Sequence, residues 1–178
     1  MDETTLQAAR RGDKDALGVL LRDLQDSWYR MSLSLLSNPD LADDATQETA
    51  IRFMRQLPGF RGESQLRTWS LGICLNVARE IRRWSAGRRM SGTDVEAIDS
   101  ADPAPAPDAS AERSEEVRSL RDLLALLPER QREAVVLRFF EDMSVEQTAD
   151  AMGCAPGTVK ATVHQALRAL RRKLEPLV

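Results

Sequence analysis

The segment from Met143 to Leu174 restricts the fold most, because it has the pattern of two helices joined by a tight turn. Ser144 and Gln147 have the spacing of a capping box, in which each side chain satisfies a backbone amide at the start of a helix. Gly153 is the residue type preferred where a helix ends in a left-handed conformation, and Pro156 suits the first turn of the next helix. The segment therefore predicts one helix from Ser144 and a second from Pro156.

Both predicted helices have an apolar face at helical spacing. The first stripe contains Val145, Ala149 and Met152, and the second contains Val159, Val163, Leu167, Leu170 and Leu174. The other faces of the second helix carry small, polar and basic side chains, namely Thr158, Lys160, Ala161, Thr162, His164, Gln165 and Arg168. Such a mixture suits the major groove of DNA. This segment alone leaves open an ordinary helical hairpin with a solvated surface.

Composition sets the broad class of the protein. A chain of 178 residues can form one or two small domains with cores of their own. It contains no apolar run long enough to cross a bilayer and no signal-peptide pattern, so we expect a cytoplasmic protein. Cys74 and Cys154 lie far apart in the sequence, so we expect packing residues rather than a disulfide framework or a zinc cluster.

The net charge of −3 is distributed unevenly along the chain. Residues 91–116 carry eight acidic side chains against one base, whereas residues 1–90 and 117–178 each carry two more bases than acids. The acidic stretch also contains Pro103, Pro105 and Pro107, and it cannot bury enough apolar surface to offset the entropy of ordering. We therefore expect a mobile or extended middle at 90–111, with domains at 1–88 and 113–178 joined by a linker at 89–112.

The first domain has the pattern of a helical bundle. Apolar residues follow helical spacing at Leu17, Leu20, Leu21, Leu24, Trp28, Met31 and Leu35. Asn38 before Pro39 predicts a capped second helix to about Leu57, which Pro58 and the following glycines end. A third helix has its stripe at Leu66, Trp69, Ile73, Val77, Ile81 and Trp84. Because no segment alternates with the period of a strand, we predict an all-α fold of two helical domains.

The third predicted helix is basic. Its outward face presents Asn76, Arg79 and Arg83, and three further arginines increase the charge toward its end. Arginines near a helix C-terminus interact favourably with the helix dipole, so a solvated basic face is one interpretation. We favour a surface that follows the DNA backbone beside a base-capturing loop, because a glycine-containing loop precedes this helix.

The second predicted helix carries carboxylates on one face, at Asp40, Asp44 and Glu48. No histidine and no suitable cysteine occurs in this domain, so we expect a protein-binding or solvated face and no metal site. The only histidine, His164, lies on the helix predicted to face the groove, and no nucleophile can be assigned a base. We therefore expect no enzymatic activity, no catalytic residue and no cofactor.

Five motifs occur in order along the chain, with the acidic linker between the third and the fourth. They are Asp44-Ala45-Thr46-Gln47-Glu48, Phe60-Arg61-Gly62-Glu63-Ser64, Thr68-Trp69 with Asn76, Leu127-Pro128-Glu129-Arg130 and Gly157-Thr158-Val159-Lys160. With this order the chain resembles the extracytoplasmic-function (ECF) sigma factors of bacteria, in the sigma-70 family. The resemblance covers both domains, which would be region 2 and region 4, and it implies a transcription initiation factor.

The resemblance assigns roles to particular residues. Asp44, Gln47 and Glu48 would dock on the clamp helices of the polymerase β′ subunit, and region 4 would contact the β flap. The loop that starts at Phe60 would hold a flipped base of the −10 element. With its following helix it supplies the expected −10 contacts, which are Phe60, Arg61, Glu63, Ser64, Asn76, Arg79 and Arg83. The expected −35 contacts are Arg138, Thr158, Lys160, Ala161, Thr162, His164, Gln165 and Arg168. An anti-sigma partner is also implied.

The chain departs from the family pattern on the groove-facing helix. Family members often have arginine at the positions of Thr162, Gln165 and Leu167, so phosphate attraction and bidentate guanine readout are weaker here. We expect an unusual −35 sequence, and Gln165 can pair with adenine instead. Two other functions stay open from the residues alone: a stand-alone helix-turn-helix regulator that binds a palindrome as a dimer, and an interaction module with no DNA role.

Overall fold

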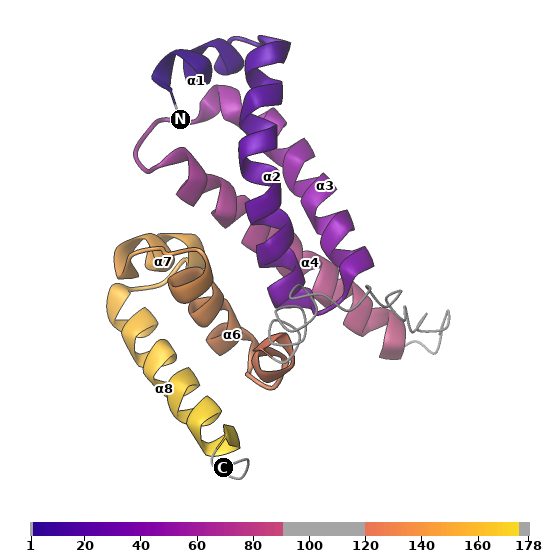
Figure 1. The fold of residues 1–178 in the computed structure, drawn as a ribbon, viewed down its shortest axis with the longest axis vertical. Coiled ribbons are helices and arrows are strands. Elements are labelled where there is room, and N and C mark those ends of the chain that lie inside the picture. Colours follow the sequence, from indigo (N-terminus) through magenta and orange to yellow (C-terminus); the bar gives the residue numbers. More distant parts are fainter. Residues whose placement is uncertain (1, 91–119, 175–178) are drawn as a thin grey trace, which may run out of the picture.

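The computed structural model describes residues 2–90 and 120–174 (Figure 1). Over these residues the chain forms helices and short turns without a strand, as the all-α prediction requires. The predicted linker at 89–112 lies almost entirely outside the described residues, so its predicted mobility stays a prediction. None of the helices in the described part is long and apolar enough to span a membrane.

Five elements form the N-terminal half: α1 (Glu3–Arg10), α2 (Lys14–Leu36), α3 (Pro39–Gln56), the 3-10 turn η1 (Leu57–Gly59) and α4 (Leu66–Met90). The sequence patterns predicted the last three helices. Caps fix two of the starts, since the Asp13 carboxylate accepts the Ala16 amide at 2.9 Å and the Asn38 side chain accepts the Leu41 amide at 3.0 Å. The sequence analysis missed α1, because this short helix has few apolar residues to reveal a period.

The C-terminal half begins with a helical segment at 120–125. It continues through α6 (Glu129–Val135), the π-helical segment η2 (Val136–Phe140), α7 (Val145–Met152) and α8 (Pro156–Leu174). The helix-turn-helix prediction is confirmed here. Ser144 and Gln147 make both hydrogen bonds of the capping box, and Gly153 ends α7 with a φ of 64°. Local sequence therefore sets the angle at which α8 leaves α7.

Aromatic side chains form the centre of the N-terminal half. Trp28 and Phe53 are fully buried with ring centroids 5.3 Å apart, and Trp69 lies 5.6 Å from Phe53. The Trp28 indole donates a hydrogen bond to the Ser70 hydroxyl at 3.0 Å, so its polar atom is satisfied inside the core. These contacts hold α2, α3 and α4 together.

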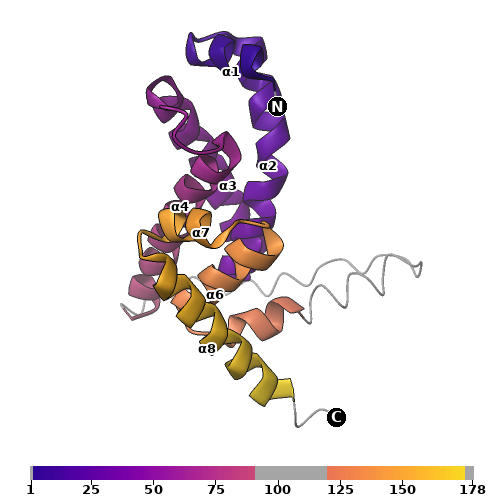
Figure 2. The ribbon, with the colours of Figure 1, turned by 90° about the vertical axis from the view of Figure 1, so that its left-hand side faces the viewer.

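The two halves pack against each other through one continuous cluster of buried apolar residues. The sequence patterns predicted the two helical domains but not this contact between them. Helix α4 packs on α2 and α3 and also on α7 of the other half, and Figures 1 and 2 show α7 beside α4. A Cβ atom added to Gly72 of α4 would lie 4.0 Å from the Ala151 Cα of α7. Helix α4 can contact elements of both halves because it is apolar on more than one side, with Leu71 and Leu75 buried outside the predicted stripe.

Three large side chains of the predicted apolar stripes are exposed instead. Trp84 is 58% exposed, Leu167 48% and Leu174 42%. On α8 the smaller Ala166 is fully buried beside Leu167. A regular period marks an apolar face, whereas burial depends on which neighbouring elements cover that face. Ala169 and Leu170 lie beyond Leu167 and still pack against the core, so Leu167 is exposed because of the side on which it lies.

Candidate nucleic-acid interface

The loop between η1 and α4 borders a cavity of about 460 Å³, a volume that could admit a nucleobase. One wall comes from the loop, through Arg61 and Ser64, and the other from α1, through Gln7 and Arg10. The loop turns at Gly62, whose φ of 75° is unfavourable for other residues. This cavity is where the sequence placed base capture.

Side chains of the loop differ in how accessible they are. Arg61 and Glu63 are exposed and lie 3.8 Å apart, and Ser64 is half-buried. Phe60 is only 6% exposed and packs against Trp69 with ring centroids 4.9 Å apart. The Phe60 ring therefore supports the loop from the core side, and Phe60 also lines the cavity.

The basic residues expected on the outer face of α4 lie in two environments. Asn76 and Arg83 are exposed and border a shallow cavity of about 240 Å³ together with Arg52. Arg79, which also borders this cavity, was expected to face outward, but it donates two hydrogen bonds to Glu133 of α6, at 2.8 and 2.7 Å. The expectation of an outward Arg79 was wrong, since the C-terminal half covers that side of α4.

Glu133 is the centre of an arginine cluster between the halves. Its carboxylate is fully buried, and besides Arg79 it accepts from Arg82 at 3.3 Å and lies 3.5 Å from Arg130. Burial by itself would raise the pKa of this carboxyl. The hydrogen bonds and positive charge of the arginines outweigh burial, so the pKa of Glu133 is lowered and the group is ionised at neutral pH. A neighbouring carboxylate, Glu129, also accepts from Arg82.

A second buried carboxylate links the halves at the other end of α4. Glu141 accepts from the Ser27 hydroxyl of α2 at 2.6 Å and from Arg67 of α4 at 2.5 Å. Here burial outweighs these contacts, so the pKa of Glu141 is raised. Helix α6 also links the halves through Arg132, which donates to the Leu35 carbonyl oxygen of α2 at 2.9 Å.

The predicted groove-facing side of α8 is open to solvent. Thr158, Lys160, Ala161, His164, Gln165 and Arg168 are exposed, and Thr162 is half-buried. Val159 on the opposite side is fully buried and anchors the helix. Arg138 lies half-buried in η2. The fold therefore presents the side chains of this helix together, as the sequence predicted.

The acidic face of α3 is partly engaged within the chain. Asp44 and Gln47 are exposed, whereas Glu48 accepts from Arg52 at 2.7 Å. Arg52 also donates two hydrogen bonds to Glu80 of α4, at 2.9 and 2.7 Å. These carboxylates raise the pKa of Arg52, and Arg52 lowers that of Glu80. Of the three residues expected to dock on polymerase, Asp44 and Gln47 are therefore unengaged within the described chain, whereas Glu48 is paired with Arg52 while 40% of its side chain remains exposed.

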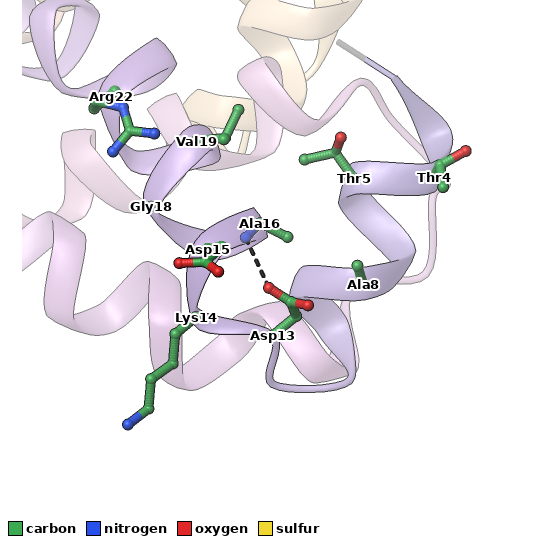
Figure 3. A pocket seen from close by; sticks show the side chains of 10 residues that line it. All are labelled: Thr4, Thr5, Ala8, Asp13, Lys14, Asp15, Ala16, Gly18, Val19 and Arg22. Atoms are coloured by element: carbon green, nitrogen blue, oxygen red, sulfur yellow. Dashed lines mark hydrogen bonds between the residues drawn. The ribbon is translucent and has the colours of Figure 1, made fainter.

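A further cavity of about 470 Å³ lies where α1 turns into α2 (Figure 3). Figure 3 shows the Asp13 carboxylate accepting from the Ala16 amide beside it and the Lys14 side chain pointing away. None of the residues predicted to contact DNA or polymerase lines this cavity. It therefore lies outside the candidate interface.

Sequence reasoning missed Glu133, Glu141 and Arg67. Their partners in the opposite half are 51 to 114 residues away in the chain, beyond the reach of any local pattern. One signal was present, because Glu133 directly precedes the apolar run that begins at Ala134. A carboxylate placed beside such a run needs a buried partner.

Within residues 2–90 and 120–174, the structure contains no group of three or more His, Cys, Asp or Glu side chains suited to a metal ion. Both cysteines are free, with Cys74 buried and Cys154 half-buried. Burial raises the pKa of the Cys74 thiol to about 11, so it is protonated and inert at neutral pH. These positions agree with the packing role predicted for both residues.

Comparison with known families matches both halves. A family model described as sigma-70 region 2 matches residues 20–90, and one described as sigma-70, region 4 matches residues 118–170. The RNA polymerase sigma-H factor of Pseudomonas aeruginosa is 31% identical over 99% of this chain and 95% of its own. The ECF RNA polymerase sigma-E factor of Escherichia coli is 30% identical over 99% of this chain and 96% of its own.

Among solved structures, the sigma factor RpoE from Bartonella quintana, in complex with the anti-sigma factor NepR, superposes with a TM-score of 0.72. It is 27% identical, and the match covers 89% of this chain and 96% of that one. A match of this extent includes both packed halves.

Proposed function

Because the chain belongs to the sigma-70 family, in its ECF group, we propose that it binds core RNA polymerase and directs it to promoters by recognising −35 and −10 elements. The observation that carries this proposal is the family's two regions in order, the second with an open polar face on α8. Region 2 occupies the proposed domain at 1–88 and region 4 the one at 113–178. The proposed activity is binding rather than catalysis, and it takes place in the cytoplasm.

We place recognition of the −35 element on α8. Lys160 and Arg168 supply positive charge toward phosphates, and Gln165 can make a bidentate pair with adenine. The buried Val159 and the left-handed turn at Gly153 fix the helix, so the exposed side chains stay on one side. This arrangement supports insertion of the helix into a major groove.

We place capture of a −10 base in the cavity beside the loop. Unstacking a base costs a few kcal/mol, and a cavity that holds the extruded base offsets this cost. Arg61 and Ser64 border the cavity and can contact the base or its phosphate. Strand opening is then driven by binding, without hydrolysis of ATP.

We place polymerase docking on the exposed face of α3, with Asp44 and Gln47 as the first contacts and Glu48 beside them. A region 4 contact to the β flap and an anti-sigma partner complete the proposed assembly. The complex of the Bartonella quintana sigma factor with its anti-sigma factor supports the last of these.

Transcription with purified bacterial core polymerase on a library of genomic fragments tests the proposal. We expect initiation at defined sites that depends on this chain. Charge-preserving changes at remote exposed positions, such as Arg22→Lys on α2, should leave it intact. Complete absence of core-dependent transcripts from a folded chain would contradict the proposed function.

The stand-alone regulator and the interaction module receive no support from the family match, which covers both regions of a sigma factor. The discriminating measurement is affinity for duplex DNA. A sigma factor should bind promoter fragments weakly alone and much more tightly with core polymerase, whereas a dimeric regulator binds its palindrome unaided.

A further inference from the structure

The contact between α4 and α6 places the buried carboxylate of Glu133 on two arginines of the proposed −10 helix. Glu133 holds Arg79 with two parallel hydrogen bonds and also binds Arg82. Arg79 and Arg82 are only 19% and 23% exposed, and the Glu133 carboxylate is fully buried. In this arrangement both guanidinium groups are neutralised by the chain itself.

The geometry of this pair resembles that of an arginine with a phosphate. A guanidinium donates two parallel hydrogen bonds equally well to a carboxylate or to a phosphate. The atoms that Arg79 offers to Glu133 are therefore those that it would offer to the DNA backbone. The two interactions exclude each other.

Other parts of the proposed machinery remain accessible in the same structure. The groove-facing side of α8 is exposed, and so are Asp44 and Gln47 on α3. The contact between the halves thus affects α4 selectively. A chain in this state can meet polymerase and duplex DNA while its −10 helix is occupied.

Some buried polar atoms at the contact between the halves have no hydrogen-bond partner within the described chain. Among the described residues, the Nε atoms of Arg82 and Arg132 are buried without a hydrogen-bond partner. Each buried donor without an acceptor costs free energy in the packed state, which lowers the cost of separating the halves. Such a contact is suited to opening rather than to permanent closure.

We propose that Glu133 is an internal competitor for nucleic-acid phosphate at Arg79 and Arg82, so that these two arginines of α4 bind DNA only after the two halves separate. This inference rests on the proposed function and adds an autoinhibited free state to it. The RpoE structure from Bartonella quintana matches both halves while bound to an anti-sigma factor. In this chain, Glu133 of the C-terminal half itself contacts Arg79 and Arg82 of the N-terminal half.

The first test is binding of the full chain to a fluorescent single-stranded DNA of random sequence, about 15 nucleotides long, at low salt. Glu133→Gln keeps the shape of the side chain and removes the competing charge. We expect this variant to bind the DNA at least about fivefold more tightly than the parent chain. A factor of about five is the lower end of the usual range by which one interaction changes the affinity of another. Adding Arg79→Ala to it should remove the gain.

Asp23→Asn is the matched control, because it removes the same charge from an exposed position on α2, outside the contact. It should bind like the parent chain. Equal affinity of the Glu133→Gln variant and the parent, or an equal gain from Asp23→Asn, overturns the proposal.

A second variant keeps the test decisive if Glu133→Gln does not fold. Gly72 and Ala151 approach closely enough for a disulfide between α4 and α7, since a Cβ on Gly72 would be 4.0 Å from the Ala151 Cα. Gly72→Cys with Ala151→Cys, in a Cys154→Ser background that removes a competing thiol, locks the halves together on oxidation. We expect single-stranded DNA binding to fall about tenfold when oxidised and to recover on reduction.

Unchanged binding across oxidation and reduction of the locked variant overturns the proposal. Failure of the proposed function is distinguishable, because it appears in transcription assays with core polymerase. If the chain supports transcription but neither variant changes DNA binding, only the competitor is wrong. If no variant gives a core-dependent transcript, the proposed function and the inference that rests on it both fail.

Discussion

Helices α4 and α8 have the same proposed task, and the structure leaves them in opposite states. On α4, Arg79 and Arg82 are bound to carboxylates of the other half, whereas on α8 Lys160 and Arg168 are exposed. Both helices carry basic residues at helical spacing. The difference shows that an accessible cation depends on which neighbouring element covers it and not on the charge of its own helix.

The largest expected contrast is in stability. Arg79→Ala leaves Glu133 buried with weaker partners, and breaking such a pair should lower the free energy of unfolding by about 2–3 kcal/mol. Lys160→Ala on exposed α8 should change it by less than about 0.5 kcal/mol. Urea unfolding measures both. Similar losses for the two variants would show that α4 and α8 do not differ in this way.

Binding of duplex DNA by the free chain should show the opposite contrast. Lys160→Ala removes one proposed phosphate contact, so the slope of log affinity against log salt should decrease by about 1, and affinity at low salt by roughly tenfold. Arg79→Ala should leave this slope unchanged, because Arg79 is already neutralised. Fluorescence anisotropy across a salt series measures both slopes. An equal change of slope for the two variants would contradict the expected contrast between α8 and α4.

The orientation of α8 should depend on local turn chemistry. Gly153→Ala places a side chain at a φ of 64°, which should cost about 1 kcal/mol of unfolding free energy. Gly157→Ala, inside α8 with nothing within 4 Å of the added Cβ, should instead stabilise the chain by about 0.5 kcal/mol. Thermal unfolding of both variants tests the sign. If Gly153→Ala stabilised the chain, the left-handed conformation at this residue would not be what requires glycine in the turn between α7 and α8.

The smallest effect is a pH dependence of opposite sign for the two buried carboxylates. The pKa of Glu133 is lowered from 4.5, so its contribution to stability is complete above that pH and is lost as pH falls toward the lowered value. The pKa of Glu141 is raised from 4.5, so its ionisation costs stability as pH rises above that value.

Urea unfolding at several pH values, comparing the parent chain with Glu133→Gln and Glu141→Gln, measures these two dependences. The stability advantage of the parent over Glu133→Gln should shrink on acidification below about pH 4.5. Its advantage over Glu141→Gln should shrink as pH rises above about 4.5. Parallel pH dependence of the two variants would contradict the opposite pKa directions.

The sequence by itself determined the elements whose signals are local. Asn38 and Ser144 cap helices through backbone amides three residues away, and Gly153 ends α7 through its own backbone. The ordered motifs of region 2 and region 4 were also legible from the residues. Such signals survive without tertiary contacts because the interacting groups are neighbours in the chain.

Only the tertiary structure decided which side of α4 is covered. Arg79 has a basic, outward-facing pattern in the sequence, yet its partner Glu133 lies 54 residues away in the other half. Trp84 and Leu167 continue regular stripes and are nevertheless exposed, because no neighbouring element in the described part of the chain covers them. Periodicity specifies a face of a helix, whereas the packing of distant elements specifies what that face meets. The accessibility of the two proposed DNA-binding helices therefore follows from the association of the halves.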